Sequence, residues 1–272
     1  EIKKRINSVK NIAQVTKAME LVAASKMKRA QQNALKSRPF AQKIEEISKN
    51  LSSKIDPKLH PLLTKRAEVH AVLIVLISPP RGLCGPLVSS LLKNTFDFVA
   101  KLKESKANKI KFKYIVVERK GRDALLRMGE NIIAYFEKLG ERPELGDLRP
   151  IIKIISDGFL SKEFDEVYLS YTRFVSTLTQ QPTISKVLPI RVAQFSKKGE
   201  DYNYLLEPSP DEILKALLPQ YLNLQLYQFY LEAIASEHSA RMVSMKNATD
   251  NAKEVKNALT VEYNKSRQAS IT

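Results

Sequence analysis

The chain has 272 residues, of which 43% are hydrophobic and 27% charged, a composition typical of globular proteins and not of disordered ones. Its longest uninterrupted apolar run, residues 71–77, is far shorter than the ~20 residues of a membrane-spanning helix, so we expect no direct membrane span. A single cysteine excludes an internal disulfide, and a formal net charge of +16 predicts an acidic partner.

Glycine is confined to the middle of the chain, because all eight glycines lie between Gly82 and Gly199. Glycine and proline interrupt helices, so we expect long helices in residues 1–56 and 209–272 around a compact domain in residues 67–207. Residues 1–50 hold 12 Lys/Arg and 4 Asp/Glu, so half of the excess positive charge lies on the first helix. We therefore expect the acidic partner to contact that helix.

The first segment carries a stripe of apolar residues at intervals of three or four, which predicts a helix with one buried face. The stripe consists of Ile2, Ile6, Val9, Ile12, Val15, Met19 and Val22. Residues 55–66, which contain Pro57 and Pro61, are interpreted as a linker to the next domain.

The middle of the chain alternates between predicted strands and helices. Runs rich in Val, Ile and aromatic residues predict strands at residues 71–77, 110–117, 165–174 and 187–195. Helices are predicted between them at residues 87–103, 123–128 and 147–160. This alternation is typical of an open, Rossmann-like α/β sheet with right-handed crossovers.

The last segment has a regular heptad pattern that predicts a second long helix. Asp211 is interpreted as the N-cap, and Pro219 is expected to end or kink the first part of the helix. The two terminal helices are expected to pack as an antiparallel coiled coil, because the middle domain returns the chain to its start. The predicted seam runs through Leu214, Leu217, Tyr221, Leu224, Gln228, Leu231, Ala235, His238, Met242, Met245, Thr249, Ala252, Lys256, Leu259 and Tyr263.

The motif at residues 81–85 (RGLCG) follows the first strand, where α/β proteins often bind phosphates. It lacks the glycine pattern of a nucleotide loop, so we expect no cofactor. Cys84 has two interpretations, an activated thiol or a buried structural cysteine, and the second is favoured because no histidine lies nearby. His60, His70 and His238 lack ligand spacing, so we expect no metal site, and no set of residues predicts a catalytic centre.

Two basic segments leave alternatives open. Residues 119–123 (RKGRD) fit a small anion site or, more simply, a solvated turn into a helix. The basic first helix fits a nucleic-acid or membrane-surface binder as well as a protein partner. Nucleic acid is disfavoured because no aromatic residue for base stacking precedes Phe40 and no known docking module is present.

Several longer strings, taken together, resemble the gamma subunits of F-type ATP synthases, and the resemblance covers essentially the whole chain in order. The strings are residues 2–11 (IKKRINSVKN), 15–31 (VTKAMELVAASKMKRAQ), 37–41 (SRPFA), 81–85 (RGLCG), 119–123 (RKGRD), 235–242 (ASEHSARM), 245–252 (MKNATDNA) and 263–272 (YNKSRQASIT).

The resemblance implies a non-catalytic rotor subunit without a cofactor. In this family the terminal helices form a shaft inside a hexamer of alternating alpha and beta subunits. The α/β domain forms a foot that sits, with the epsilon subunit, on the membrane-embedded c-ring. Ion flow turns the ring and shaft, and the shaft shifts the conformations of the catalytic beta subunits. The implied location is peripheral, on the cytoplasmic face of a bacterial plasma membrane or, alternatively, the matrix face of the mitochondrial inner membrane.

The resemblance also assigns individual residues. Arg267 and Gln268 match family residues that hydrogen-bond a loop of beta near the tip of the shaft. The bearing that faces the acidic loop of beta includes Met19, Lys26, Lys28, Arg29 and, on the other helix, Arg241. Met19 is equally well interpreted as part of the coiled-coil core. Gly82, Leu83, Cys84 and Gly85 form a family motif of the foot.

One departure concerns the turn before that motif. The family usually has Ser-Asp followed by a basic residue there, whereas this chain has Ser78, Pro79, Pro80 and Arg81. The acidic residue is missing, so we transfer no ion-binding role to this turn.

Overall fold

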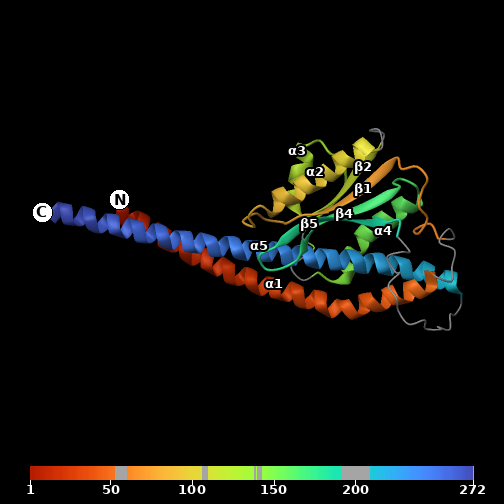
Figure 1. Cartoon of the computed structure of the whole chain (residues 1–272), viewed down its shortest axis with the longest axis horizontal. Helices are drawn as coiled ribbons and strands as arrows, with labels where there is room; N and C mark the ends of the chain where they lie inside the picture. The colour runs from red at the N-terminus through yellow and green to blue at the C-terminus, as the bar shows by residue number, and fades with distance from the viewer. Residues whose placement is uncertain (53–59, 106–109, 138, 140–142, 191–208, 272) are drawn as a thin grey trace.

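The computed structural model describes residues 1–52, 60–105, 110–137, 139, 143–190 and 209–271. Helix α1 spans Ile2–Ser52 and helix α5 spans Pro210–Ile271. The two helices lie side by side with both chain ends at the same end of the molecule, so they run antiparallel as predicted (Figure 1). No helix among the described residues is long and apolar enough to span a membrane. We call the α1–α5 pair the shaft.

A five-stranded sheet with its covering helices, which we call the foot, lies beside the shaft at the end away from the two termini (Figure 1). The strand order is β3-β2-β1-β4-β5, with β1 to β4 parallel and β5 antiparallel to β4. The strands are β1 Ala71–Ile77, β2 Lys111–Val117, β3 Ile132–Phe136, β4 Glu166–Phe174 and β5 Gln180–Leu188. The helices are α2 Leu87–Ser105, α3 Arg119–Arg127, the 3-10 helix η2 Leu145–Leu148 and α4 Arg149–Leu160.

The sheet has a core on each face, because successive side chains of a strand point to opposite sides. On β1, Leu73, Val75 and Ile77 pack into a cluster that includes residues of α4 and α5. Val72, Ile74 and Leu76 pack into a second cluster with residues of α2 and α3. Helix α5 therefore belongs to the core of the foot as well as to the shaft.

The prediction of strands was right where apolar residues follow one another without interruption. Strand β1 has the predicted bounds, and all of it is buried except Ala71, which is half-buried. Strand β3 was missed, because it is a short edge strand whose five residues are only half-buried. Helix α3 begins at Arg119 and not at Asp123, so the RKGRD motif is helical and not a turn.

The strand predicted at residues 187–195 coincides with a strand of the structure only at Val187 and Leu188. Strand β5 ends at Leu188, and residues 191–195 lie outside the described residues. The strand begins at Gln180 and contains Pro182. Proline has no backbone N–H to donate to a neighbouring strand, so it is tolerated in a strand at the edge of a sheet. The first seven residues of β5 are half-buried or exposed, so polar residues are tolerated there and no continuous apolar run marks the strand.

The N-cap predicted for α5 was wrong, and of the two outcomes expected at Pro219, an end or a kink, only the end is excluded. The helix begins at Pro210, and the Ser209 hydroxyl accepts a hydrogen bond from the Glu212 N–H at 3.3 Å, so Ser209 and not Asp211 is the N-cap. Pro219 lies inside α5 and does not end it. Its neighbours Leu218 and Leu222 are fully buried, and this packing keeps the segment helical despite the lost hydrogen bond.

The shaft seam on α1 differs from the predicted stripe. Ile12, Val15 and Val22 are more than half exposed, whereas the small residues Ala23 and Ala30 are buried against α5. One series of buried or half-buried positions alternates by four and three and consists of residues 2, 6, 9, 13, 16, 20, 23, 27 and 30. Met19, Ala24 and Lys26 are half-buried beside this series. The predicted stripe left this heptad register after residue 9 because it followed large apolar side chains.

On α5 the predicted seam is confirmed from residue 242 to residue 263, where each predicted position is buried or half-buried. The hydroxyls of Thr16 and Thr249 meet across the seam at 2.7 Å. Small side chains on both helices allow this close approach.

Asp165 links the segment before β1 to the start of β4. Its carboxylate accepts hydrogen bonds from the backbone N–H groups of His70 and Ala71 at 2.7 and 3.0 Å. The Arg66 guanidinium donates to it at 2.7 Å. Burial alone would raise the pKa of Asp165, but the two backbone hydrogen bonds and Arg66 together hold this pKa below its usual value.

Asp165→Asn is therefore expected to lower the free energy of unfolding by about 2 kcal/mol at pH 7. An aspartate whose pKa is lowered by folding stabilises above its unfolded pKa of about 3.9, and this contribution is lost as the pH falls through the folded value. Urea unfolding should thus show a difference between wild type and variant that shrinks in acid. Asp250→Asn, in an exposed pair with Lys253, is the control; an equal loss there would contradict this account.

Candidate functional site

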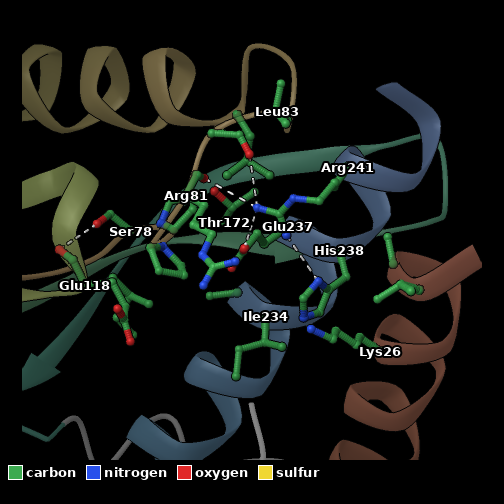
Figure 2. A pocket seen from close by; sticks show the side chains of 18 of the residues that line it. Lys26, Ser78, Arg81, Leu83, Glu118, Thr172, Ile234, Glu237, His238 and Arg241 are labelled. Carbon is green, nitrogen blue, oxygen red and sulfur yellow. Dashed lines mark hydrogen bonds and ion pairs between the residues drawn. The ribbon is translucent and has the colours of Figure 1, made fainter. Parts of the chain in front are cut away.

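A cavity of about 500 Å³ lies at the joint between the shaft and the foot (Figure 2). Its walls come from α1, α5 and the turn that connects β1 to α2 (residues 78–86, the β1–α2 turn), together with residues beyond or near the carboxyl ends of β2 and β4. It brings together Met19, Lys26 and Arg241, which were assigned to a bearing, and Gly82 and Leu83 of the foot motif.

Arg241 on α5 holds the β1–α2 turn against the shaft. Its guanidinium donates to the Gly82 carbonyl at 3.2 Å and, more weakly, to the Arg81 carbonyl at 3.4 Å. It also pairs with Glu237, one turn earlier on the same helix, at 2.7 Å. The Arg241 and Glu237 side chains are only 12% and 9% exposed. The hydrogen bonds and the ion pair of this guanidinium therefore lie within the joint (Figure 2).

Glu237 is, with Glu118, one of two buried acidic residues in the cavity wall. Burial raises the pKa of its carboxyl, while the Arg241 guanidinium and the more distant Lys26 ammonium oppose that rise. Lys26 extends from α1 toward His238 on α5 (Figure 2). Charges from both helices thus converge on a poorly solvated site, where each interaction is stronger than at an open surface.

Cys84 is buried and packs with Leu87 and Ala240. Burial raises the pKa of its thiol, although the nearby Arg241 opposes the rise. A thiol with a raised pKa is a poor nucleophile, so the structure favours the structural interpretation of this cysteine. Gly85 has φ +58°, and an added Cβ would lie 3.2 Å from the Ser244 hydroxyl of α5. The glycine therefore lets the turn approach the shaft closely.

The other predicted contact residues lie away from the joint. Lys28 and Arg29 are exposed on α1, and Arg267 and Gln268 are exposed near the end of α5. Arg267 lies 26 residues beyond Arg241, roughly 40 Å along the helix at 1.5 Å per residue. The predicted residues thus form a buried joint, an exposed basic stretch and a distant tip.

Glu237, Glu118 and Thr172 are among the cavity residues that were not singled out from the sequence. Glu237 could have been, since it stands four residues before Arg241, the spacing of a helical ion pair. Glu118 and Thr172 carry no local signal, because only the sheet brings them to the joint. Among the described residues, no group of three His, Cys, Asp or Glu side chains is arranged to hold a metal ion.

The backbone of Glu118 is strained. Its φ of 70° and ψ of 161° fall in a region populated almost entirely by glycine. The backbone is held there by the hydrogen bond from Glu118 N–H to the Phe136 carbonyl at 2.8 Å and by the Ser78 hydroxyl, which donates to the Glu118 carbonyl at 3.2 Å. Leu83, with φ 63°, is a second non-glycine residue with positive φ in the cavity wall. Strained backbone of this kind is concentrated at functional sites.

The free energy of unfolding of Glu118→Gly is expected to be about 1 kcal/mol higher than that of Glu118→Ala, so the glycine variant is the more stable one. Both variants lose the same carboxylate, but only glycine adopts this conformation without strain, and its extra freedom in the unfolded chain offsets part of the gain. Denaturant unfolding of the two variants measures the difference. Equal stability, or a more stable alanine variant, would show that the backbone at residue 118 stores no strain.

Comparison with known proteins identifies the family. A family model described as ATP synthase matches residues 1–272. Proteins named ATP synthase gamma chain from Roseiflexus castenholzii and Dehalococcoides mccartyi are 46% and 44% identical to this chain; each alignment covers all of the chain and 93% of the relative. This chain belongs to the ATP synthase gamma chain family.

Solved structures related to this gamma-family chain have the same fold. A chain from the central stalk and c-ring of the Tetrahymena thermophila mitochondrial ATP synthase matches with a TM-score of 0.61 and 24% identity, over 86% of this chain and 99% of that one. A chain from the rotor of the Euglena gracilis enzyme matches with a TM-score of 0.67 and 18% identity, over 100% and 98% of the two chains. The combination of shaft and foot is therefore shared with rotor subunits of distant organisms.

Proposed function

We propose that this chain is the central shaft of a rotary ATP synthase and performs no bond chemistry itself. It couples rotation of a membrane ring to conformational change in catalytic subunits. The observation that carries the proposal is the antiparallel α1–α5 pair, which extends beyond the foot (Figure 1). Arg241 of α5 joins this pair to the foot by a hydrogen bond to the Gly82 carbonyl. Membership of the gamma chain family supports the same role.

The joint gives this role a physical basis. Torque applied to the foot reaches the shaft through contacts that bridge the two, and the bonds from Arg241 to the β1–α2 turn are such contacts. Helix α5 adds to them because it is buried in the core of the foot, with Leu222 and Leu224 among the buried residues. A rigid connection of this kind would transmit rotation without slippage.

The proposed partners are the alpha and beta subunits around the shaft, and the epsilon subunit and c-ring at the foot. Lys28 and Arg29 support contact with an acidic loop of beta, because they are exposed on the basic first helix. Exposed charges contribute only ~0–1 kcal/mol each, which suits a surface that must pass several partners in turn. We place the complex peripherally on the cytoplasmic face of a bacterial plasma membrane.

Arg241 and Met19 are proposed to act mainly inside the joint. Both line the cavity, and the Arg241 side chain is largely enclosed by its own chain. The bearing contact is then proposed for Lys28 and Arg29, with Lys26 between the joint and the surface. Gly82, Leu83, Cys84 and Gly85 are proposed to shape the β1–α2 turn that Arg241 holds.

The double variant Arg267→Ala/Gln268→Ala is expected to weaken coupling at the tip without destabilising the foot. Both residues are exposed near the end of α5, far from the joint, so we expect their loss to remove hydrogen bonds to a partner and to leave the foot unchanged. ATP-driven proton pumping by vesicles that contain the assembled complex should fall several-fold. Lys265→Ala/Ser266→Ala, two exposed residues directly before them, is the matched control, and unchanged pumping in the first variant would contradict the proposed contact.

Co-assembly tests the proposed function as a whole. The full chain should form a complex with alpha and beta subunits that contains one copy of this chain per hexamer. Its binding to duplex DNA should be weak and fall steeply with salt, as expected for a basic surface without a recognition module. Tight DNA binding with no assembly would instead support the nucleic-acid interpretation of the first helix.

A further inference from the structure

The cavity at the joint lies where open α/β sheets bind ligands. In the order β3-β2-β1-β4-β5, the chain places β2 and β3 on one side of β1 and then crosses to place β4 on the other. The direction therefore reverses between β1 and β4. Ligands of such sheets bind outside the carboxyl ends of the strands at this point of reversal. Ser78, directly after β1, and Thr172, near the end of β4, both line the cavity.

Thr172, which lines the cavity, has a buried hydroxyl with no hydrogen-bond partner in the part of the chain that the structure describes. Thr172 is 3% exposed, and its Oγ1 forms no hydrogen bond with any described residue. A buried hydroxyl left without a partner costs about 1–3 kcal/mol, so such groups are usually satisfied by water or a ligand. The Thr172 carbonyl, by contrast, accepts a hydrogen bond from the Ser236 hydroxyl of α5 at 2.9 Å, which fixes this part of β4 beside the cavity.

The lining of the cavity is mostly apolar with a positive balance of charge. Met19, Val22 and Ile234 form apolar walls from both shaft helices. The charged side chains in the wall are Lys26, Arg81, Glu118, Glu237 and Arg241. Three cations and two carboxylates give this lining a formal net charge of +1. A ligand that matches this lining has an apolar body and a single negative charge.

We propose that the joint cavity binds a small amphipathic monoanion, such as an aromatic or alkyl carboxylate or sulfonate. Its volume of about 500 Å³ is within the range of small-molecule sites. The anionic group lies toward Lys26 and Arg81, the Thr172 hydroxyl donates a hydrogen bond to it, and the apolar body rests against Met19 and Val22. A molecule bound there contacts the foot and both shaft helices at once. This site goes beyond the proposed shaft role and does not depend on it.

The absence of tryptophan from the sequence provides a sharp test. Val22→Trp places one tryptophan in the cavity wall at a position that is 53% exposed. Val261→Trp, at an exposed valine on α5 roughly 30 Å along the helix from Arg241, is the matched control. The probe is 8-anilinonaphthalene-1-sulfonate, an aromatic monosulfonate, added to each purified full-length variant while energy transfer from tryptophan is measured.

We expect saturable energy transfer from Trp at position 22 and little from position 261. Thr172→Val, introduced with Val22→Trp, should weaken binding about fivefold, and Lys26→Gln about tenfold. Leu83→Trp, at another position in the cavity wall, serves as a second reporter if the first variant folds poorly by circular dichroism. Equal transfer from positions 22 and 261, transfer that does not saturate, or unchanged affinity in both the Thr172 and Lys26 variants would overturn the proposal.

Discussion

Arg241→Ala is expected to lower the free energy of unfolding by about 3 kcal/mol and to reduce coupling between the foot and the shaft. The substitution removes the hydrogen bonds to the β1–α2 turn and leaves the Glu237 carboxylate buried beside its own helix without its closest counter-charge. Denaturant unfolding of the full chain measures the first effect. ATP-driven rotation of the assembled complex measures the second.

The pH dependence of this variant follows from Glu237. Its pKa is raised by burial, and the rise is expected to be larger without Arg241. A carboxyl whose folded pKa is raised favours the folded state when protonated, and this advantage is lost as the pH rises through the folded value. The variant should therefore be less impaired at pH 5 than at pH 8.

Two further substitutions distinguish the loss of the Arg241 contacts in the joint from the general effect of removing a positive charge. Adding Glu237→Gln to Arg241→Ala should recover part of the lost stability, because no buried charge remains. Lys253→Ala, in the exposed pair with Asp250 on the same helix, should change stability by less than about 1 kcal/mol. If Arg241→Ala behaves like Lys253→Ala, the joint is not held by this guanidinium.

Ala23→Phe is expected to destabilise the shaft by about 3 kcal/mol. Ala23 is 2% exposed in the seam between α1 and α5, so a phenyl ring there forces the helices apart or out of register. The seam nearby is fixed by the Thr16–Thr249 hydroxyl pair, which cannot follow such a shift without losing its hydrogen bond. Thermal and denaturant unfolding of the full chain should both report the loss.

The matched control is the adjacent residue. Val22→Phe places the same ring at a position that is 53% exposed, outside the seam and in the open wall of the joint cavity, and should change stability by less than about 0.5 kcal/mol. The comparison therefore tests the register of the coiled coil directly. A large effect at Val22 and a small effect at Ala23 would mean that the helices pack through the large apolar stripe after all.

How far the fold could be predicted depends on how each element is buried. Strand β1 was predicted with its bounds because it is buried on both faces and every residue in it is apolar. Strand β5 was misplaced because it lies at the sheet edge and is largely half-exposed, so polar residues interrupt its pattern. The heptad seam of α5 was found because large side chains such as Leu259 and Tyr263 occupy it at the tip.

The seam of α1 was misassigned for the opposite reason. Its buried positions near the joint are Ala23 and Ala30, whose small side chains give little hydropathy signal, while Ile12 and Val15 are large and exposed. A search for hydrophobic periodicity responds to how apolar each side chain is. Two helices that pack closely instead require small side chains where they touch. The small residues were visible in the sequence but carried no weight in the prediction.

The candidate site was only partly accessible from the sequence. Met19, Lys26 and Arg241 were assigned through family resemblance, and the structure places them in one cavity with Gly82 and Leu83. That Arg241 points inward to the turn was not foreseen, because its carbonyl partners lie about 160 residues away in the chain. Backbone strain at Glu118 and the unpartnered hydroxyl of Thr172 depend on three-dimensional context alone.

Rotation of single complexes tests the central claim most directly. The full chain would be assembled with alpha and beta subunits, and a bead attached through Met128→Cys, a site at the end of α3 that is 61% exposed; the native Cys84 is buried and would not compete. We predict unidirectional, stepwise rotation of the bead when ATP is supplied. A complex that hydrolyses ATP while the foot stays still would contradict the account of this chain as a rigid shaft.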